Sequence, residues 1–561
     1  MTSTNTDESV SGAGERADRG LRKDLGFWSL LAAGLGSVIG SGWLFSSLYA
    51  AQDAGPAAML AWVIGGGLML LVALVFAELG MTKPESGGLV RYPMYSHGGL
   101  AAGIVGWAMW ISYVGNPPTE AAGVVQYAAA YLPGVYDGEQ LTVPGIGIAV
   151  VLMAAFVALN WFGVKLFARS NTTVTAIKII IPTATVVLLV ASGFDSSNLT
   201  DHGGFAPYGW SAALGSIATA GMVFAYTGFR NVVELSGEAR DPRRTIPRAL
   251  VATIVVTIVL YLALQMAFLG AVPAGALGGG WHGVNFDSPF ADLAMVLGLS
   301  WLSWTLIADS MLSPSGAGIV YTAANSRNVF GLAKNGFFPT SLTALNRRGV
   351  PARALTLNFV VGLAYLLPLP SWHSIISVTG SIAAFTFQIG SVSLVAFRAS
   401  GLTRPDTRLR GMAVIAPAAF VVSSLVVFWV SFPKLGIAMG LTALGILWYA
   451  VVWARSGRRV SELVGGAWLV VYLAGMTLLS ALGSFDGAGL IGAPWDSVVV
   501  AVFSLAVYVW GARSGVAYMT ARPAMVAQLR READEDRGDT PLDDAAPGGA
   551  SPDAGRGTAG S

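Results

Sequence analysis

The sequence contains no cysteine and only four histidines among its 561 residues. Without cysteine, disulfide bonds and thiolate metal ligands are excluded. The histidines are scattered rather than clustered, so no metal site is predicted: they are His97, His202, His282 and His373. The sequence also lacks a nucleotide-binding loop and a paired nucleophile and base. These absences argue against an ATP-driven pump and against an enzyme, and no cofactor is expected.

Charge is also scarce, since only 11% of the residues are charged while 54% are hydrophobic. A soluble protein of this length would carry about a quarter charged residues. The net charge is only +2, and Lys and Arg are spread among loops, so a nucleic-acid partner is not expected. Uncharged apolar stretches recur from about residue 26 to residue 512, and nearly all reach the roughly 20 residues that cross a bilayer, the stretch at 355–369 being shorter. The sequence therefore predicts an all-α integral membrane protein whose surroundings are the lipid bilayer.

The apolar stretches predict about 14 spans, which we number as segments 1 to 14. Their approximate limits are 26–50, 54–78, 98–132, 143–163, 171–193, 210–236, 248–271, 288–330, 355–369, 373–398, 413–431, 435–454, 463–483 and 496–516. The long segments 3 and 8 are expected to tilt or to extend beyond the bilayer.

The basic residues give an orientation for these spans. If the N-terminus is cytoplasmic, all but three of the 33 Lys and Arg residues fall in cytoplasmic loops or tails or at the cytoplasmic ends of segments. The exceptions are Lys434 in an outer loop and Lys178 and Arg230 within segments. Both termini are therefore expected on the cytoplasmic side. Residues 1–22 and 520–561 are too polar to bury a core, which predicts disordered cytoplasmic ends.

Segment 1 is interrupted by four glycines between residues 34 and 42. Each glycine weakens a helix by about 1 kcal/mol relative to alanine, so the middle of this segment is expected to unwind. Unwound backbone within a membrane is tolerated where it is buried in protein or lines a cavity, and there it can hold a substrate carboxylate. The alternative is close helix packing through small residues.

Segment 6 has a similar interruption near Tyr226, with Gly221 and Gly228 on either side. Two interrupted helices, each opening a block of five spans, are typical of a transporter with inverted repeats and a site between them. Residues 23–200 would form the first repeat, 201–400 the second, and 401–519 four peripheral helices, segments 11 to 14.

Lys178, Arg230, Glu120 and Asp309 are ionisable residues within the segments. Lys178 is far from either end of segment 5, which favours a role in proton coupling or in place of a sodium ion over a side chain that snorkels to the interface. Arg230 follows the second break and could pair with an acidic substrate or, as the alternative, with Glu234 four residues later. Glu120 and Asp309 could be proton-relay groups or partners of these cations.

Several motifs resemble one family. Gly40-Ser41-Gly42-Trp43-Leu44-Phe45, Ala77-Glu78-Leu79-Gly80 and Gly237-Glu238-Ala239-Arg240-Asp241-Pro242 are similar to motifs of the amino acid–polyamine–organocation superfamily of permeases. Arg91-Tyr92-Pro93-Met94-Tyr95-Ser96-His97-Gly98, Leu312-Ser313-Pro314-Ser315-Gly316 and Pro370-Ser371-Trp372 resemble its bacterial aspartate/proton symporter branch.

This resemblance implies a five-plus-five inverted-repeat fold with alternating access in a bacterial inner membrane. It implies that the substrate carboxylate meets the backbone of Ser41, Gly42 and Trp43 and that its amino group meets carbonyls near Val38, Phe224 and Tyr226. It also implies that Lys178 replaces sodium. Arg230 stands where many relatives carry an acidic residue, which fits an acidic substrate. With Ile39 and Gly228 at the two breaks, these are the candidate substrate-binding residues.

The sequence thus predicts proton-coupled uptake of aspartate or glutamate, with Lys178, Asp309 and Glu120 as the proton-coupling residues. An exchanger for another amino acid or an amine is the alternative within transport. A channel or a non-transporting scaffold is the alternative from another class.

Overall fold

The computed structural model describes residues 24–85, 87–162, 165–456 and 460–537. Across these ranges the chain is helical and contains no β-strand, which confirms the predicted all-α class for this part of the chain. Within it, eight helices are long and apolar enough to cross a membrane. A ninth span results if the bent pair Gly209–Thr219 and Met222–Glu234 is counted as one. Residues 1–22, which were predicted to be disordered, lie outside the described residues.

Helices occur at each predicted segment. The first half of the chain forms α2 (Phe27–Val38), α3 (Gly42–Ala54), α4 (Ala58–Thr82), α5 (Gly88–His97), α6 (Gly99–Val114), α7 (Asn116–Ala128), α8 (Val143–Trp161), α9 (Lys165–Gly193), α10 (Gly209–Thr219), α11 (Met222–Tyr226), α12 (Phe229–Glu234) and α13 (Pro242–Ala271). The second half forms α14 (Pro289–Val296), α15 (Ser300–Lys334), α16 (Ala352–Leu366), α17 (Trp372–Thr386), α18 (Gln388–Ala399), α19 (Met412–Phe428), α20 (Lys434–Ser456), α21 (Ser461–Val464), α22 (Ala467–Leu482), α23 (Trp495–Thr520) and α24 (Pro523–Arg537).

The two long segments are interrupted helices rather than single long spans. Segment 3 divides at Gly115 into α6 and α7, where Pro117 and Pro118 cannot donate backbone hydrogen bonds to the preceding turn. Segment 8 was predicted to start at residue 288, but α14 ends at Val296 and α15 starts at Ser300. Gly298 between them has a φ of +76°, a conformation that ends the first helix.

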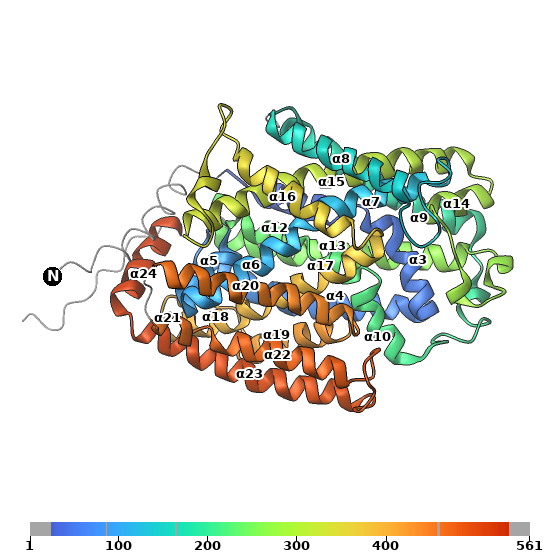
Figure 1. The fold of residues 1–561 in the computed structure, drawn as a ribbon. Helices are drawn as coiled ribbons and strands as arrows, with labels where there is room; N and C mark the ends of the chain where they lie inside the picture. Colours follow the sequence, from blue (N-terminus) through green and yellow to red (C-terminus); the bar gives the residue numbers. More distant parts are fainter. Residues whose placement is uncertain (1–23, 86, 163–164, 457–459, 538–561) are drawn as a thin grey trace, which may run out of the picture.

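The helices pack in two groups (Figure 1). In one group, α2, α3, α4 and α13 surround the short helices α10, α11 and α12. In the other, α7 and α15 pack against each other and against α8 and α16, while α9 contacts α2, α13 and α15. The C-terminal helices α19, α20, α22 and α23 lie along one flank. Segments 1 and 6 are therefore central, and most of their residues are buried.

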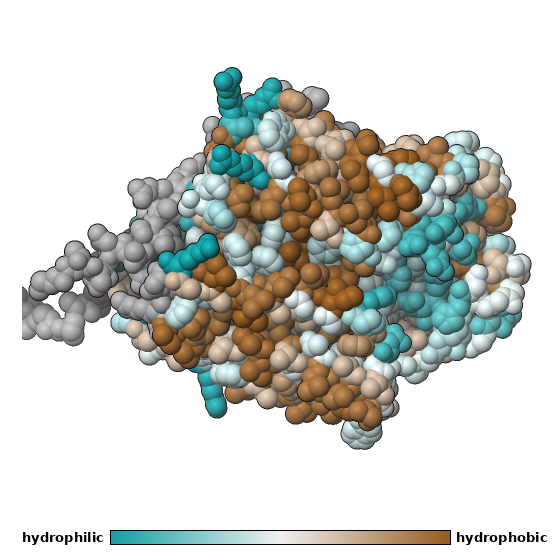
Figure 2. Space-filling view, viewed as in Figure 1, coloured by the Kyte–Doolittle hydropathy of each residue, from teal (hydrophilic) through white to brown (hydrophobic). Residues whose placement is uncertain are grey.

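The surface has the hydropathy that a bilayer requires. In Figure 2, hydrophobic residues cover most of the middle of the visible face, and hydrophilic residues gather at the end that carries α14 and at isolated points near the opposite end. Large apolar side chains such as Val151, Val259, Leu447 and Val502 are more than half exposed on the described helices. An apolar belt of this kind is expected where lipid replaces water.

The end of the molecule that carries α5 and α24 is held by ion pairs (Figure 1). The guanidinium of Arg398 on α18 binds both carboxylate oxygens of Glu78 on α4, and Leu409 N–H donates to the same carboxylate over 2.8 Å. Nearby, Lys83 pairs with Glu85 at 3.1 Å and Arg91 pairs with it at 3.6 Å. Burial alone would raise the pKa of Glu85, but these two cations outweigh burial and hold its pKa below the ordinary value. The cluster therefore stabilises the fold at neutral pH and loses that contribution as the pH falls through the depressed pKa.

Part of the predicted disordered tail is folded. Residues 523–537 form α24, which buries Val526, Leu529 and Ala533 against the bundle. Its Glu532 lies 3.4 Å from Lys83, and its Asp534 lies 2.6 Å from Arg404. The prediction of disorder from residue 520 was therefore wrong for this stretch, because a mostly polar helix gains stability from partners that are distant in sequence. Residues 538–561 lie outside the described residues.

Candidate functional site

Segment 1 is broken in its middle, as the glycines predicted. Helix α2 ends at Val38, and α3 begins at Gly42. Ile39 leaves the helical conformation with φ −90° and ψ 80°, and Gly40 N–H donates to the Val38 carbonyl over 3.1 Å instead of continuing the helical ladder. The break is completely buried, since Ile39 and Ser41 are 0% exposed. Unpaired backbone groups are costly in such a place, so their partners define the site.

The amide of Ser41 binds a carboxylate. Ser41 N–H donates to Glu120 Oε2 over 2.8 Å, and Glu120 is buried on α7. Gly40 makes this approach possible: a Cβ at that position would lie 2.5 Å from Glu120 Oε1 and 3.0 Å from Oε2. The second oxygen, Oε1, has no hydrogen-bond partner among the described residues. The break in segment 1 therefore holds the negative group of segment 3 at the position where a carboxylate was predicted to bind.

The last three carbonyls of α2 are capped by side chains from three other segments. Lys178 on α9 donates to the Gly36 carbonyl over 3.3 Å. Tyr321 on α15 donates to the Ser37 carbonyl over 2.9 Å, and Tyr261 on α13 donates to the Val38 carbonyl over 3.1 Å. The Val38 carbonyl, a predicted partner of a substrate amine, thus already accepts two hydrogen bonds, one from Tyr261 and one from Gly40 N–H.

Lys178 does not snorkel, because its side chain is only 3% exposed and reaches inward to Gly36. Two buried carboxylates, Glu120 and Asp309, interact with its charge electrostatically, although neither forms an ion pair with it within 4 Å among the described residues. Asp309 accepts a hydrogen bond from Ser313 over 2.8 Å, and its Oδ2 has no partner in the described part of the chain. The three predicted proton-coupling residues thus belong to one electrostatic cluster around segment 1.

Segment 6, predicted to be interrupted near Tyr226, is interrupted on both sides of that residue. The first break is at Ala220 and Gly221, where the chain bends by 47° and Gly221 has a φ of +85°. A Cβ on Gly221 would also lie 2.8 Å from Ile376 and 2.9 Å from the Ser46 hydroxyl. Glycine is therefore required both for the positive φ and for the lack of space. The second break separates α11 from α12 at Thr227 and Gly228. The sequence prediction was therefore about five residues from the sharper break.

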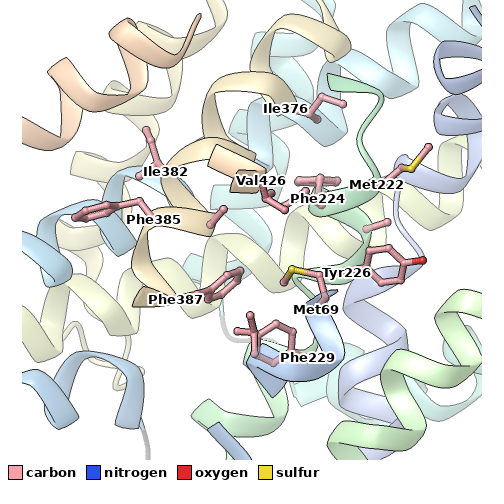
Figure 3. Packing of buried hydrophobic residues seen from close by; sticks show 14 of the residues in the cluster. Met69, Met222, Phe224, Tyr226, Phe229, Ile376, Ile382, Phe385, Phe387 and Val426 are labelled. Carbon is pink, nitrogen blue, oxygen red and sulfur yellow. The ribbon is translucent and has the colours of Figure 1, made fainter. Parts of the chain in front are cut away.

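The residues of the short helix α11 lie in an apolar cluster (Figure 3). Figure 3 shows Phe224 and Tyr226 among buried side chains that include Met69, Ile376 and Phe387. Tyr226 donates to the Trp62 carbonyl over 2.6 Å, so its hydroxyl faces α4 rather than segment 1. The Phe224 ring is close to Gly42, where a Cβ would lie 3.7 Å from the ring. Phe224 thus borders the break, whereas Tyr226 supports α11 from behind.

Other predicted binding residues have packing roles in this structure. A Cβ on Gly228 would lie 2.3 Å from Val38 and 3.0 Å from the Gly34 carbonyl, so Gly228 allows close contact between segments 6 and 1. The ring of Trp43 packs at 5.6 Å from that of Phe290 on α14, and its Nε1 has no partner among the described residues. These positions shape the break rather than line one cavity with Ser41.

Arg230 does not form the predicted ion pair with Glu234. Its guanidinium lies over the ring of Tyr113 at 4.5 Å, and Tyr113 donates its hydroxyl proton to Glu234. The one hydrogen bond of the Arg230 side chain is long, at 3.5 Å from Nη1 to the Ser112 hydroxyl, and Nε has no partner among the described residues. Arg230 is only 3% exposed. A buried cation with unused donors is suited to an anionic ligand.

The sequence analysis did not identify Tyr113, Tyr261, Tyr321 or Trp372 as site residues. Tyr113, Tyr261 and Tyr321 lie in apolar segments, where an aromatic side chain adds to the hydropathy and gives no separate signal. Trp372 directly precedes segment 10, and its motif indicated a family resemblance rather than a site. Their contribution comes from one polar atom at the end of each ring, and which carbonyl or hydroxyl that atom reaches depends on tertiary packing.

Comparison with known proteins finds one family and several relatives. Residues 25–454 match the model of a family described as amino acid permease. The chain is 40% identical over 512 residues to the glutamate/serine transporter AimA of Bacillus subtilis, covering 88% of this chain and 94% of that protein. It is 33% identical over 507 residues to the aspartate-proton symporter of Bacillus subtilis, covering 88% and 97%. It is 27% identical over 402 residues to the human cationic amino acid transporter 4, covering 68% and 61%.

Proposed function

Because this chain belongs to the amino acid permease family, whose members compared above are transporters and not enzymes, we propose that it carries aspartate or glutamate together with protons into the cell. The observation that carries the proposal is the hydrogen bond between Ser41 N–H and the Glu120 carboxylate. A break that already holds one carboxylate has the donor geometry to hold the α-carboxylate of an amino acid.

Proton coupling follows from competition for that amide. Ionised Glu120 accepts a strong charge-assisted hydrogen bond from Ser41, and a protonated carboxyl accepts a weaker one. Protonation of Glu120 therefore frees the Ser41 amide for the substrate, and return of the proton restores the internal bond. Binding of the proton then raises the affinity for the substrate carboxylate, and binding of the substrate raises the affinity for the proton. This positive coupling is the thermodynamic requirement for symport.

Lys178 would link this exchange to movement of segment 1. Its bond to the Gly36 carbonyl ties α9 to the end of α2, next to the break. A change in the charge of the Glu120, Asp309 and Lys178 cluster alters the strength of this link, since the three charges interact. The helix group of α2, α3, α4, α10–α12 and α13 would then rock against the group of α7, α8, α15 and α16, as in an inverted-repeat transporter.

The acidic substrate is supported by Arg230 and by the relatives. The guanidinium has unused donors in a buried position at the second break, where a side-chain carboxylate of aspartate or glutamate would find a partner. The relatives that cover most of the chain are named for transport of glutamate and serine in one case and aspartate in the other. The location that fits this function is a bacterial inner membrane, with both termini in the cytoplasm.

The proposal is tested by uptake of radiolabelled aspartate, glutamate and serine into proteoliposomes without sodium, with an imposed pH gradient that is acidic outside. We expect the acidic amino acids to accumulate and a proton ionophore to collapse the accumulation. Uptake that ignores the pH gradient but requires unlabelled amino acid inside would identify an exchanger instead. Uptake of serine alone would exclude an acidic substrate.

Substitution of Gly40 by alanine tests the role of the Glu120 contact. The added methyl group would lie 2.5 Å from the carboxylate, so Glu120 must leave the Ser41 amide. We expect proton-driven accumulation to fall roughly 10-fold or more, the size expected for a lost charged hydrogen bond. Gly67→Ala on α4 is the matched control, because its methyl group would meet nothing within 4 Å. Accumulation by Gly40→Ala equal to that of Gly67→Ala would contradict the proposed competition.

A further inference from the structure

The motif Pro370-Ser371-Trp372 is not used by the mechanism above, although Trp372 is in the middle of the site. Trp372 opens α17, and the Ser371 side chain caps this helix by accepting from Ser374 N–H. The Trp372 side chain is 0% exposed. A tryptophan at the first position of a helix is thus buried completely, and its contacts explain why.

Trp372 touches both broken segments. Its indole Nε1–H donates to the Ser41 hydroxyl over 2.7 Å, next to the break in segment 1. A Cβ on Gly221, in the sharper break of segment 6, would lie 3.0 Å from the far edge of the same ring. A Cβ on Gly123, one turn after Glu120 on α7, would lie 3.2 Å from its Cδ1. Two glycines therefore make room for this indole from opposite sides.

The same ring is packed on α3. Phe45 lies 5.1 Å from Trp372 between ring centroids, and Tyr49 is stacked on it at 5.7 Å. The neighbouring residue His373 is stacked on Tyr49 at 4.4 Å and is bonded to the Thr219 carbonyl, just before the break of segment 6. These contacts fix the plane of the indole, and hence the direction of its N–H.

The hydrogen bond between Trp372 and Ser41 can have only one direction. An indole nitrogen is a donor and cannot accept, so the Ser41 hydroxyl must be the acceptor. A serine hydroxyl has one proton and two lone pairs, and an acceptor role toward Trp372 leaves that proton to be donated elsewhere. The Ser41 amide already donates to a carboxylate, that of Glu120. Both donors of Ser41 can therefore serve one carboxylate.

We propose that Trp372 is a positioning residue that turns the Ser41 hydroxyl into a second donor for the α-carboxylate of the transported amino acid. The inference rests on the proposed function only in placing that carboxylate at Ser41. It adds a contribution from segment 10 to a site that the sequence motifs placed on segments 1 and 6. Because every amino acid has an α-carboxylate, this role affects affinity for all substrates alike.

The test is Trp372→Phe, which keeps an aromatic ring for Phe45 and Tyr49 and removes the N–H donor together with part of the ring. Loss of one neutral hydrogen bond predicts a roughly 3- to 10-fold weaker substrate affinity, seen as a higher KM for uptake at unchanged maximal rate per folded protein. Ser41→Ala is expected to have an effect of similar size, and the double variant no larger effect than either one. The matched control is Trp429→Phe, which makes the same change of ring and removes an indole hydrogen bond to the Ser497 hydroxyl on α23.

A structural role for Trp372 gives a different pattern. It predicts a lower melting temperature and a lower maximal rate with unchanged KM, or effects of the two substitutions that multiply, and either result would overturn the inference. Binding of a panel of amino acids by the purified protein tests the positioning role of Trp372 separately from the proposed function. If the wild type binds only neutral amino acids, the acidic substrate is wrong, yet weaker binding by Trp372→Phe would still support the positioning role.

Discussion

Lys178→Ala is expected to abolish proton-driven accumulation of aspartate. The substitution removes the buried ammonium that holds the Gly36 carbonyl and leaves Glu120 and Asp309 without their shared cation. A hydrogen bond to a charged group contributes about 1.5 to 3 kcal/mol, so the driven rate should fall roughly 10- to 100-fold. The measurement is uptake into sodium-free proteoliposomes, with and without the pH gradient.

Two controls separate charge from packing in this experiment. Lys178→Met keeps the length and apolar volume of the stem and removes only the charge, so it should behave like the alanine variant. Thr185→Ala changes another buried position on α9, whose hydroxyl bonds only to the Ile181 carbonyl of its own helix, and should leave accumulation intact. Accumulation that persists in Lys178→Met would remove Lys178 from the coupling mechanism.

Arg230→Gln is expected to weaken transport of acidic amino acids selectively. If the unused donors of Arg230 bind the side-chain carboxylate, their loss should raise the KM for aspartate roughly 10- to 100-fold. Serine lacks that carboxylate, so any serine uptake should change little. The measurement is the ratio of aspartate to serine uptake at matched amounts of folded protein.

The alternative is that Arg230 only balances the charge of Glu234, with which it interacts through the Tyr113 ring. In that case Arg230→Gln destabilises the protein by leaving the partly buried Glu234 carboxylate uncompensated, and a second substitution, Glu234→Gln, should restore function. A substrate-binding role predicts that the double variant is stable but still selects poorly for aspartate. Full recovery of aspartate affinity in the double variant would show that the role of Arg230 is structural.

Much of the helical framework could be predicted because hydropathy is a local property. Each apolar segment contains helix in the structure, and the break of segment 1 lies where its glycines predicted it. Segment 6 was harder, because glycines at 221 and 228 both interrupt it and only packing against Ile376 and Ser46 identifies the sharper bend. Helix α24 could not be predicted for a related reason, since its stability comes from Lys83 and Arg404.

The sequence indicates candidate residues for the site, but it does not predict their contacts. Buried ions in apolar segments pointed to Glu120, Lys178 and Arg230, because charges are costly there. Their partners could not be read from the sequence: Glu120 binds a backbone amide, Lys178 a carbonyl, and Arg230 an aromatic ring. The backbone groups that a broken helix leaves unpaired have no sequence pattern that shows which side chain binds them. These contacts could therefore be identified only from the structure.

The central claim is that an acidic amino acid and a proton enter together. The most direct measurement encloses a pH-sensitive dye in sodium-free proteoliposomes and adds aspartate outside with no imposed pH gradient. If a proton enters with aspartate, the lumen acidifies as labelled aspartate enters, and Lys178→Met abolishes the acidification. Entry of labelled aspartate without any acidification of the lumen would contradict the central claim.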